Sequence, residues 1–474
     1  MNSGSSNANI NANIEILNHQ TIIITAPSLD PTQNVSGVST VVQFIIDNNK
    51  EREYRHFQIG KTDRESGGVL QRLWRIWRCY GEWTKLIHNS QSTIHNSVIH
   101  YSFPLSAPSI LRDPWFMHYA LKKGCKMVVH VHGGLFLTAP KIPFLLERIL
   151  KWVFSWDVPF IVLSEGEKVI LKKRFGAKRV EVLPNCPDVP KDNETHLRCY
   201  ETSQKQLQNT SDARYDTQSE IATKRGCATT KTKRSLDYEN GSNNKDNRDN
   251  KDSKDNIILL NPLNSLNLEL FNFEPASVTS DLNLEPTCEA SALNQRRAII
   301  LGYLGRIEPN KGMTELLAAM KKLKAEGIRF KARFAGKEQT EGEYLPKFKE
   351  ALGDDFEYCG LVSGESKREF LGSLDVFVMP TYFEGLPMSL LETMGYGVVP
   401  VVTQVGSIPM VVKDGENGLF VKVKDVQSIV EAIRMLGQDR NLLARLSEKA
   451  ENTIKENFSA TRYVERLNAI YDSL

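Results

Sequence analysis

Two short apolar runs with a helix-forming segment between them constrain the fold more than any other part of this chain. The runs Val376–Pro380 and Val398–Val402 are typical of buried strands. Between them lies Glu384-Gly-Leu-Pro-Met-Ser-Leu-Leu-Glu392, in which Pro387 predicts the first residue of a helix and the glycines that follow predict its end. A strand, turn, helix and strand in this order predict a parallel α/β sheet. The turn directs backbone N–H groups and the positive end of the helix dipole toward a phosphate.

Two glutamates frame this predicted helix. Glu392 follows Pro387 by five residues, about 7.5 Å along the axis, which is roughly the distance from a diphosphate to the ribose of a nucleotide. A carboxylate there can accept hydrogen bonds from two ribose hydroxyls. Glu384 lies in the turn, on the sugar side of phosphates that would meet the amides of Gly385 and Leu386. The alternative is an ordinary βαβ crossover with two solvated glutamates.

A second strand-to-helix loop carries two cations. Residues 298–305 predict a buried strand and Met313–Ala325 a helix, and the loop between them holds Arg306 and Lys311. A cation at each end of a short loop can clamp a diphosphate, Arg through two parallel hydrogen bonds and Lys as a point charge. Either residue alone is commonly a solvated loop charge. The recurrence of this loop type in one sheet argues against that alternative.

With these motifs, the chain resembles the retaining glycosyltransferases of family 4, which have the GT-B fold. The matching segments of the C-terminal half are Gly305-Arg306 with Lys311-Gly312, Phe334-Ala-Gly336, Gly360, Asp375–Pro380, Glu384-Gly385 with Glu392, and Asn417-Gly418. The thinner likeness of the N-terminal half rests on Val128–Gly134, Val162–Glu165 and Val182–Asn185. It covers roughly 300 of the 474 residues. The resemblance implies two doubly wound, Rossmann-like α/β domains that face a central cleft.

The order of patterns along the chain predicts the domain limits. Strands and helices alternate from residue 21 to residue 185, and periodicity resumes at residue 298. The low-complexity run 242–256 cannot bury enough surface to fold, so we expect a long insertion that is largely disordered. The predicted parts are a flexible tail (1–19), an N-terminal acceptor-binding domain (20–189), the insertion (190–297), a C-terminal nucleotide-sugar-binding domain (298–458) and a helix that returns to the N-terminal domain (459–474).

Histidine and glycine mark the ligand edge of the N-terminal sheet. Gly37 opens a helix after the first strand and would let the backbone approach donor phosphates closely, unless this is a plain strand-to-helix connection. His132 follows the strand Met127–Val131, at the carboxyl edge where α/β proteins bind ligands. His130 lies two residues earlier on the same face. The resemblance favours His132, which matches the family's His-Gly motif, as the catalytic-site histidine.

Ser164 and Asn185 end later strands of the same half. Each is either a polar wall of the acceptor pocket or a cap of the local backbone, and the sequence leaves both interpretations open.

Composition indicates a globular protein with more than one domain. At 474 residues, with 41% hydrophobic and 25% charged residues, the chain is too long for a single core. Its seven cysteines show neither a C-x-x-C pair nor a metal-ligand spacing, which indicates a reducing compartment. A basic, apolar leader pattern is missing at the N-terminus, and so is any run of about 18 apolar residues. We therefore expect a cytoplasmic protein.

Charge is concentrated in the N-terminal part. Residues 1–190 hold 22 Lys and Arg against 15 Asp and Glu, whereas residues 298–474 hold 23 against 25. Within 70–87, arginines form one stripe and Leu and Trp largely another, which is typical of a helix at the inner membrane surface. The pattern slightly favours a different interpretation, a core-facing helix with a solvated arginine face. Nucleic acid is a weaker alternative, because no binding motif accompanies the basic residues.

The resemblance also implies the chemistry. We expect a hexose-type sugar to move from a UDP- or GDP-type donor to a saccharide or lipid-linked acceptor, with retention and with Glu384 on the sugar hydroxyls. Arg306 and Lys311 would stabilise the leaving diphosphate without a metal or other cofactor, because no D-x-D motif lies in the parts expected to fold. Two other functions stay open: a nucleotide-sugar 2-epimerase, and a catalytically silent subunit that binds nucleotide sugars.

Overall fold

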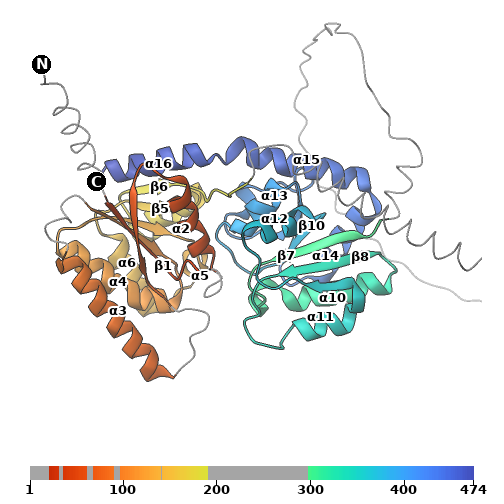
Figure 1. Ribbon diagram of the computed structural model, residues 1–474, viewed down its shortest axis with the longest axis horizontal. Helices are drawn as coiled ribbons and strands as arrows, with labels where there is room; N and C mark the ends of the chain where they lie inside the picture. The colour runs from red at the N-terminus through yellow and green to blue at the C-terminus, as the bar shows by residue number, and fades with distance from the viewer. Residues whose placement is uncertain (1–20, 31–35, 61–67, 90–96, 140, 190–296) are drawn as a thin grey trace, which may run out of the picture. The chain divides into compact units, whose positions relative to one another are not determined.

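The computed structural model describes six ranges of the chain: residues 21–30, 36–60, 68–89, 97–139, 141–189 and 297–474. The expected tail (1–19) and nearly all of the expected insertion (190–297) lie outside them. The described residues contain two parallel six-stranded sheets, both in the compact unit that spans residues 1–203 and 289–474. This confirms the predicted pair of doubly wound α/β sheets (Figure 1).

The N-terminal sheet has the strand order β2-β1-β3-β4-β5-β6. Its strands are β1 (Thr21–Ala26), β2 (Glu53–Gln58), β3 (Val98–Phe103), β4 (Lys126–Val131), β5 (Phe160–Val162) and β6 (Val180–Val182). Its helices are α2 (Gly37–Asn48), α3 (Val69–Asn89), α4 (Ala107–Lys122), α5 (Leu135–Thr138), α6 (Phe144–Phe154), α7 (Glu165–Ile170) and the π-helical turn η2 (Leu171–Phe175). Chain order reverses between β1 and β3, which makes their carboxyl ends the switch point of this sheet.

The C-terminal sheet has the order β12-β11-β10-β7-β8-β9, with its switch point between β7 and β10. Its strands are β7 (Ile299–Leu304), β8 (Phe330–Ala335), β9 (Phe356–Tyr358), β10 (Val376–Met379), β11 (Val399–Thr403) and β12 (Leu419–Val421). Its helices are α10 (Met313–Ala325), α11 (Leu345–Leu352), α12 (Gly364–Gly372), α13 (Met388–Gly395), α14 (Val426–Gln438) and α15 (Arg440–Asn457), with the 3₁₀ turns η3 (Pro309–Lys311), η4 (Gly353–Asp355) and η5 (Ile408–Met410).

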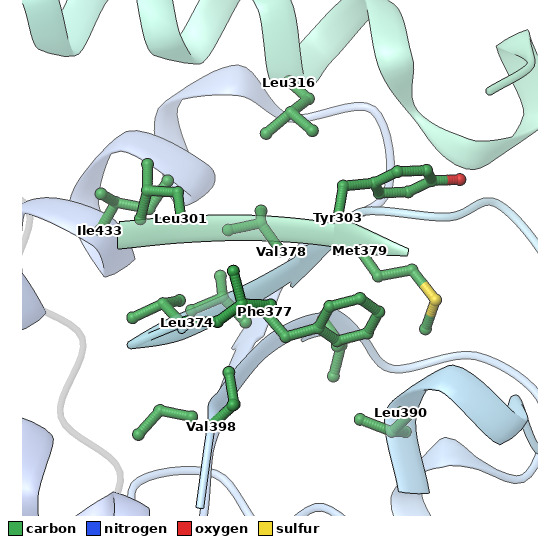
Figure 2. Packing of buried hydrophobic residues seen from close by; sticks show 14 of the residues in the cluster. Leu301, Tyr303, Leu316, Leu374, Phe377, Val378, Met379, Leu390, Val398 and Ile433 are labelled. Atoms are coloured by element: carbon green, nitrogen blue, oxygen red, sulfur yellow. The ribbon is translucent and has the colours of Figure 1, made fainter. Parts of the chain in front are cut away.

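Fully buried apolar side chains pack on the C-terminal sheet, as expected for strands that are almost continuously apolar. Phe377 and Val378 of β10 pack between Leu316 of α10 and Leu390 of α13 (Figure 2). The helix after β10 begins one residue later than expected. Pro387 is the N-cap of this helix. The φ of a proline suits either the N-cap or the first helical position, but the ψ of 129° at Pro387 is extended, so the helix begins at Met388.

The last helix, α16 (Ala460–Asp472), packs against the N-terminal sheet. Tyr471 and Leu467 are fully buried in a cluster with Ile22 and Ile24 of β1. Asn468 pairs with Asn49, 2.8 Å from Asn49 Nδ2 to Asn468 Oδ1. Residues from the far end of the chain thus complete the core of the first sheet.

Candidate functional site

The loop after β7 is held against the end of β10 by a glycine. Gly312 has φ of +73°, and a Cβ there would lie 2.1 Å from the carbonyl oxygen of Pro380. Only glycine tolerates both the left-handed backbone and this approach. The close contact brings the η3 turn with Lys311 to the carboxyl end of β10, at the switch point of the sheet.

Lys311 and Glu384 form an ion pair across that switch point. The Lys311 ammonium donates to the Glu384 carboxylate, and the two side chains are only 16% and 15% exposed, respectively. Arg306, at the start of the same loop, is 45% exposed, with its guanidinium 3.5 Å from the Glu308 carboxylate. The structure therefore brings Lys311 and Glu384 together, whereas Arg306 is half-exposed and paired with Glu308.

The backbone around Gly385 contacts residues of the N-terminal half. The Nδ2 of Asn185 donates to the carbonyl of Leu386 at 2.8 Å, so Asn185 binds the loop's backbone and does not cap its own strand. Gly133 has φ of +70°, and a Cβ there would lie 2.7 Å from the Cα of Gly385. A side chain at position 133 would force these two segments apart.

Glu392 is buried on α13 and paired with a lysine that sequence reasoning missed. Lys367 of α12 donates to the Glu392 carboxylate at 2.7 Å, and the two side chains are 26% and 6% exposed. Burial raises the pKa of Glu392, and the neighbouring ammonium opposes that rise. Lys367 lies twenty-five residues earlier in the chain, and only the fold reveals the pair.

Three histidines and a tyrosine form a row beneath the ligand edge of the N-terminal sheet, with Tyr471, His100 and His130 fully buried and His132 half-buried. The Tyr471 hydroxyl lies 2.7 Å from His100 Nδ1, and His100 Nε2 lies 3.2 Å from His130 Nδ1. The ring of His130 stacks on that of His132, with centroids 4.1 Å apart, which confirms that the two share a face. Burial lowers the pKa of His132 to about 3, so its imidazole is neutral at pH 7. His132 Nε2 is shielded from solvent and has no hydrogen-bond partner among the described residues.

Ser164 and Gly37 have local roles at helix starts. Ser164 is the N-cap of α7, and its hydroxyl accepts the Glu167 N–H at 3.1 Å. Its place in the wall of an acceptor pocket stays a prediction. Gly37 is the first residue of α2, and a Cβ there would meet no atom within 4 Å. The open space leaves room for a ligand, although part of the preceding loop lies outside the described residues.

Glu167 is a buried carboxylate that sequence reasoning missed. Its Oε2 accepts the Leu163 N–H at 2.8 Å, and its Oε1 accepts from the Ser407 hydroxyl at 3.3 Å. Burial raises its pKa from 4.5 to about 7, more than these two hydrogen bonds lower it. The Ser164-x-x-Glu167 spacing predicts a capping box, and this was the available signal. It does not predict the contact with Ser407, which lies 240 residues away.

The candidate site thus contains four features. They are the ion pair of Lys311 and Glu384 at the switch point, the exposed guanidinium of Arg306, the buried carboxylate of Glu392 on α13, and the neutral imidazole of His132. Cations at a switch point suit a phosphate group, and a carboxylate released from an ion pair can accept hydroxyl hydrogen bonds. Within the described ranges, no group of three His, Cys, Asp or Glu side chains has an arrangement that could hold a metal ion.

The segment that contains Lys311 and Glu384 is similar in sequence to known proteins. Residues 289–453 match the family model described as "Glycosyl transferases group 1". The capsular polysaccharide biosynthesis glycosyltransferase CapM of Staphylococcus aureus is 27% identical over 184 residues, which are 37% of this chain and 46% of CapM. The chain thus spans about half the length of the curated relatives it matches.

Solved structures share the fold over nearly the whole chain. HepE of Anabaena, crystallised with UDP-glucose, has a TM-score of 0.58 at 12% identity, and the match covers 96% of this chain and 100% of HepE. Sucrose-phosphate synthase of Thermosynechococcus elongatus has a TM-score of 0.59 at 14% identity, covering 96% of this chain and 99% of that one. Together with the two parallel six-stranded sheets, these matches confirm the expected GT-B fold.

Proposed function

We propose that this chain is a GT-B glycosyltransferase that moves a hexose-type sugar from a nucleotide-diphosphate sugar to a hydroxyl acceptor, in polysaccharide or glycolipid assembly. The observation that carries the proposal is the ion pair between Lys311 and Glu384 at the switch point of the C-terminal sheet. It lies inside the segment that matches the glycosyl transferases group 1 model. The similarity to CapM, a glycosyltransferase of capsular polysaccharide biosynthesis, supports the same class of reaction.

A diphosphate would exchange partners with this ion pair. The Lys311 ammonium turns to the phosphate oxygens, where the Arg306 guanidinium adds a second positive charge. The Glu384 carboxylate, released from Lys311, accepts hydrogen bonds from the hydroxyls of the donor sugar. One donor molecule thus satisfies both charges, which otherwise pair with each other.

During transfer, the site would stabilise the negative charge that develops on the leaving group. As the bond from the anomeric carbon to the phosphate oxygen breaks, negative charge gathers on the diphosphate beside Arg306 and Lys311. The acceptor hydroxyl forms its new bond on the same face, and its proton passes to the departing phosphate oxygen. This front-face route gives retention, in keeping with family 4, and needs no metal. Neutral His132 would donate or accept a hydrogen bond at the sugar.

Product analysis tests the proposal against its two alternatives. The full chain is incubated with a panel of UDP- and GDP-sugars, with and without saccharide and lipid-linked acceptors, in the presence of a chelator. We expect release of nucleoside diphosphate, acceptor-dependent product and an unchanged anomeric configuration by NMR. An epimerised donor formed without acceptor would identify an epimerase, and donor binding without turnover would identify a silent subunit.

A further inference from the structure

Helix α3 has two apolar faces, and only one of them enters the core. In its second half, Trp83 and Ile87 are fully buried, and the Trp83 indole N–H donates to the carbonyl of Phe116 at 2.9 Å. In its first half, Leu70 and Trp77 are 82% and 74% exposed. Trp77 and Trp83 are six residues apart, so at 3.6 residues per turn they point about 120° apart. The exposed face is therefore distinct from the face that packs on the sheet.

We name the exposed face the outer stripe and define it by Leu70, Leu73, Trp74 and Trp77, which are between 55% and 82% exposed. The N-terminal end of α3, which carries the stripe, extends beyond α4 in Figure 1. The interpretation of residues 70–87 as an ordinary core-facing helix thus holds only for their second half. Large apolar side chains grouped on a surface indicate an interaction site.

Positive charge borders the outer stripe. Helix α3 carries Arg72, Arg75, Arg78 and Lys85 against the single carboxylate of Glu82, which lies 3.7 Å from the Arg78 guanidinium, so the helix keeps a net positive charge. The Arg78 guanidinium lies 5.0 Å from the centre of the Trp74 ring, so cation and aromatic group reach the surface together. Apolar side chains with tryptophan, bordered by arginine, fit the interface of a bilayer that contains anionic lipid.

We infer that the outer stripe and its arginines bind this chain to an anionic membrane surface as a peripheral contact. A second copy of the chain fits less well, because pairing two outer stripes would bring like-charged arginines together. None of the helices in the described ranges is long and apolar enough to cross a membrane, which leaves binding parallel to the surface as the mode for α3. The inference does not rest on the proposed function, since a vesicle tests it without donor or acceptor.

Vesicle co-sedimentation of the full chain tests the inference with two complementary variants. One variant removes the apolar contact and keeps the charge: Leu70→Ser/Trp74→Ser/Trp77→Ser. The other removes the charge and keeps the apolar contact: Arg72→Gln/Arg75→Gln/Arg78→Gln. We expect binding to vesicles of phosphatidylglycerol and phosphatidylcholine in equal parts, weakened at least about tenfold by either variant. Binding to phosphatidylcholine alone is expected to be much weaker, and high salt should weaken anionic binding.

Matched controls separate the outer stripe from general surface properties. Met435→Ser removes another exposed apolar side chain, 48% exposed on α14, and Lys321→Gln/Lys331→Gln/Lys449→Gln removes the same charge elsewhere. Both are expected to bind vesicles like the unaltered chain. A blue shift of tryptophan emission on vesicle binding should be largely lost in the Trp74 and Trp77 variant.

Two results would overturn the inference. One is equal binding of the unaltered chain and both outer-stripe variants to anionic vesicles. The other is no vesicle binding at all, with light scattering showing a dimer that the serine variant converts to a monomer. If the serine variant does not fold, the arginine variant alone decides, because exposed arginine-to-glutamine changes leave the apolar contacts in place.

Discussion

The ammonium of Lys311 and the carboxylate of Glu384 are 73 positions apart in the chain and form an ion pair at the carboxyl ends of two neighbouring strands. Both side chains are largely withdrawn from water, so each charge depends on the other for compensation. If a diphosphate takes Lys311 in the donor complex, the same pair has one role in stability and another in catalysis. These roles can be separated by mutation.

The first prediction separates them with a double-mutant cycle. Lys311→Ala should lower transfer about 100-fold, because it removes a charge that stabilises the leaving group. It should also lower the free energy of unfolding by about 1–3 kcal/mol, since it leaves a mostly buried carboxylate unpaired. Adding Glu384→Gln should restore most of the stability and none of the activity. Denaturant unfolding and initial rates measure the two effects.

Arg306→Ala is the matched comparison for this cycle. It should lower transfer about as strongly while leaving the free energy of unfolding nearly unchanged, because Arg306 is 45% exposed. Lys331→Ala, an exposed lysine of β8, should change neither quantity. Wild-type turnover in both Lys311→Ala and Arg306→Ala would mean that the donor phosphates bind elsewhere.

A second prediction distinguishes Glu384, in the turn after β10, from Glu392 on α13. Glu392→Gln should weaken binding of a nucleoside diphosphate and raise the donor KM, because Glu392 is expected at the ribose. Glu384→Gln should mainly lower kcat, because Glu384 is expected to orient the sugar, and small misplacements of the reacting groups are costly. Titration calorimetry with the nucleoside diphosphate alone gives the cleaner measurement, since that ligand has no sugar for Glu384 to contact. The reverse pattern would mean that the nucleotide lies the other way along α13.

A third prediction concerns the protonation of Glu167. Its pKa is about 7 in the folded chain against 4.5 as the ordinary value, so between these pH values the folded state holds more protons than the unfolded state. Its contribution to stability therefore falls as pH rises from about 4.5 to 7, by up to about 3 kcal/mol. Glu167→Gln should remove this dependence and be more stable than the unaltered chain above pH 7.

Urea unfolding at pH 5 and pH 8 measures the difference between the two proteins. Glu165→Gln, at an exposed position two residues away, is the control and should show no such pH-dependent difference. A difference between Glu167→Gln and the unaltered chain that is constant with pH would show that Glu167 is ionised throughout this range.

A fourth prediction follows from the depressed pKa of His132. The folded pKa of about 3 lies below the ordinary 6.5, so His132 contributes stability that is present above pH 6.5 and is lost as pH falls toward 3. Its neutral form should persist through the working range, so the pH dependence of kcat near 6.5 should be the same in His132→Gln, at a lower rate. Loss of an acid limb near pH 6.5 in that variant would show that His132 titrates during catalysis.

Local patterns were sufficient to predict much of this fold. The helix Met313–Ala325 has the predicted limits, because Gly312 fixes its start and an apolar face runs through it. Lys311 and Glu384 could be expected to lie close together, because the carboxyl ends of neighbouring parallel strands meet at one sheet edge. The paired states could not be predicted. The contact of Lys367 with Glu392 depends on how two helices pack, and that of Glu167 with Ser407 depends on segments 240 residues apart.

Which face of helix α3 is buried could not be predicted from the sequence either. The pattern of residues 70–87 was compatible with a buried or an exposed apolar face, because Trp and Leu occur on both. Which face enters the core depends on where Phe116 of α4 meets Trp83, a long-range contact. The row from Tyr471 through His100 to His130 likewise depends on strand order and on the last helix, neither of which a local pattern specifies.

The position of Tyr471 has a consequence for synthesis of the chain. The first sheet needs Leu467 and Tyr471 to close its core, yet these residues leave the ribosome after the entire second sheet. At elongation rates of about 5 to 20 residues per second, roughly 15 to 60 seconds pass between residue 190 and residue 471. During that interval Ile22 and Ile24 have no cover from α16, so part of the first core stays open until the last helix has been made.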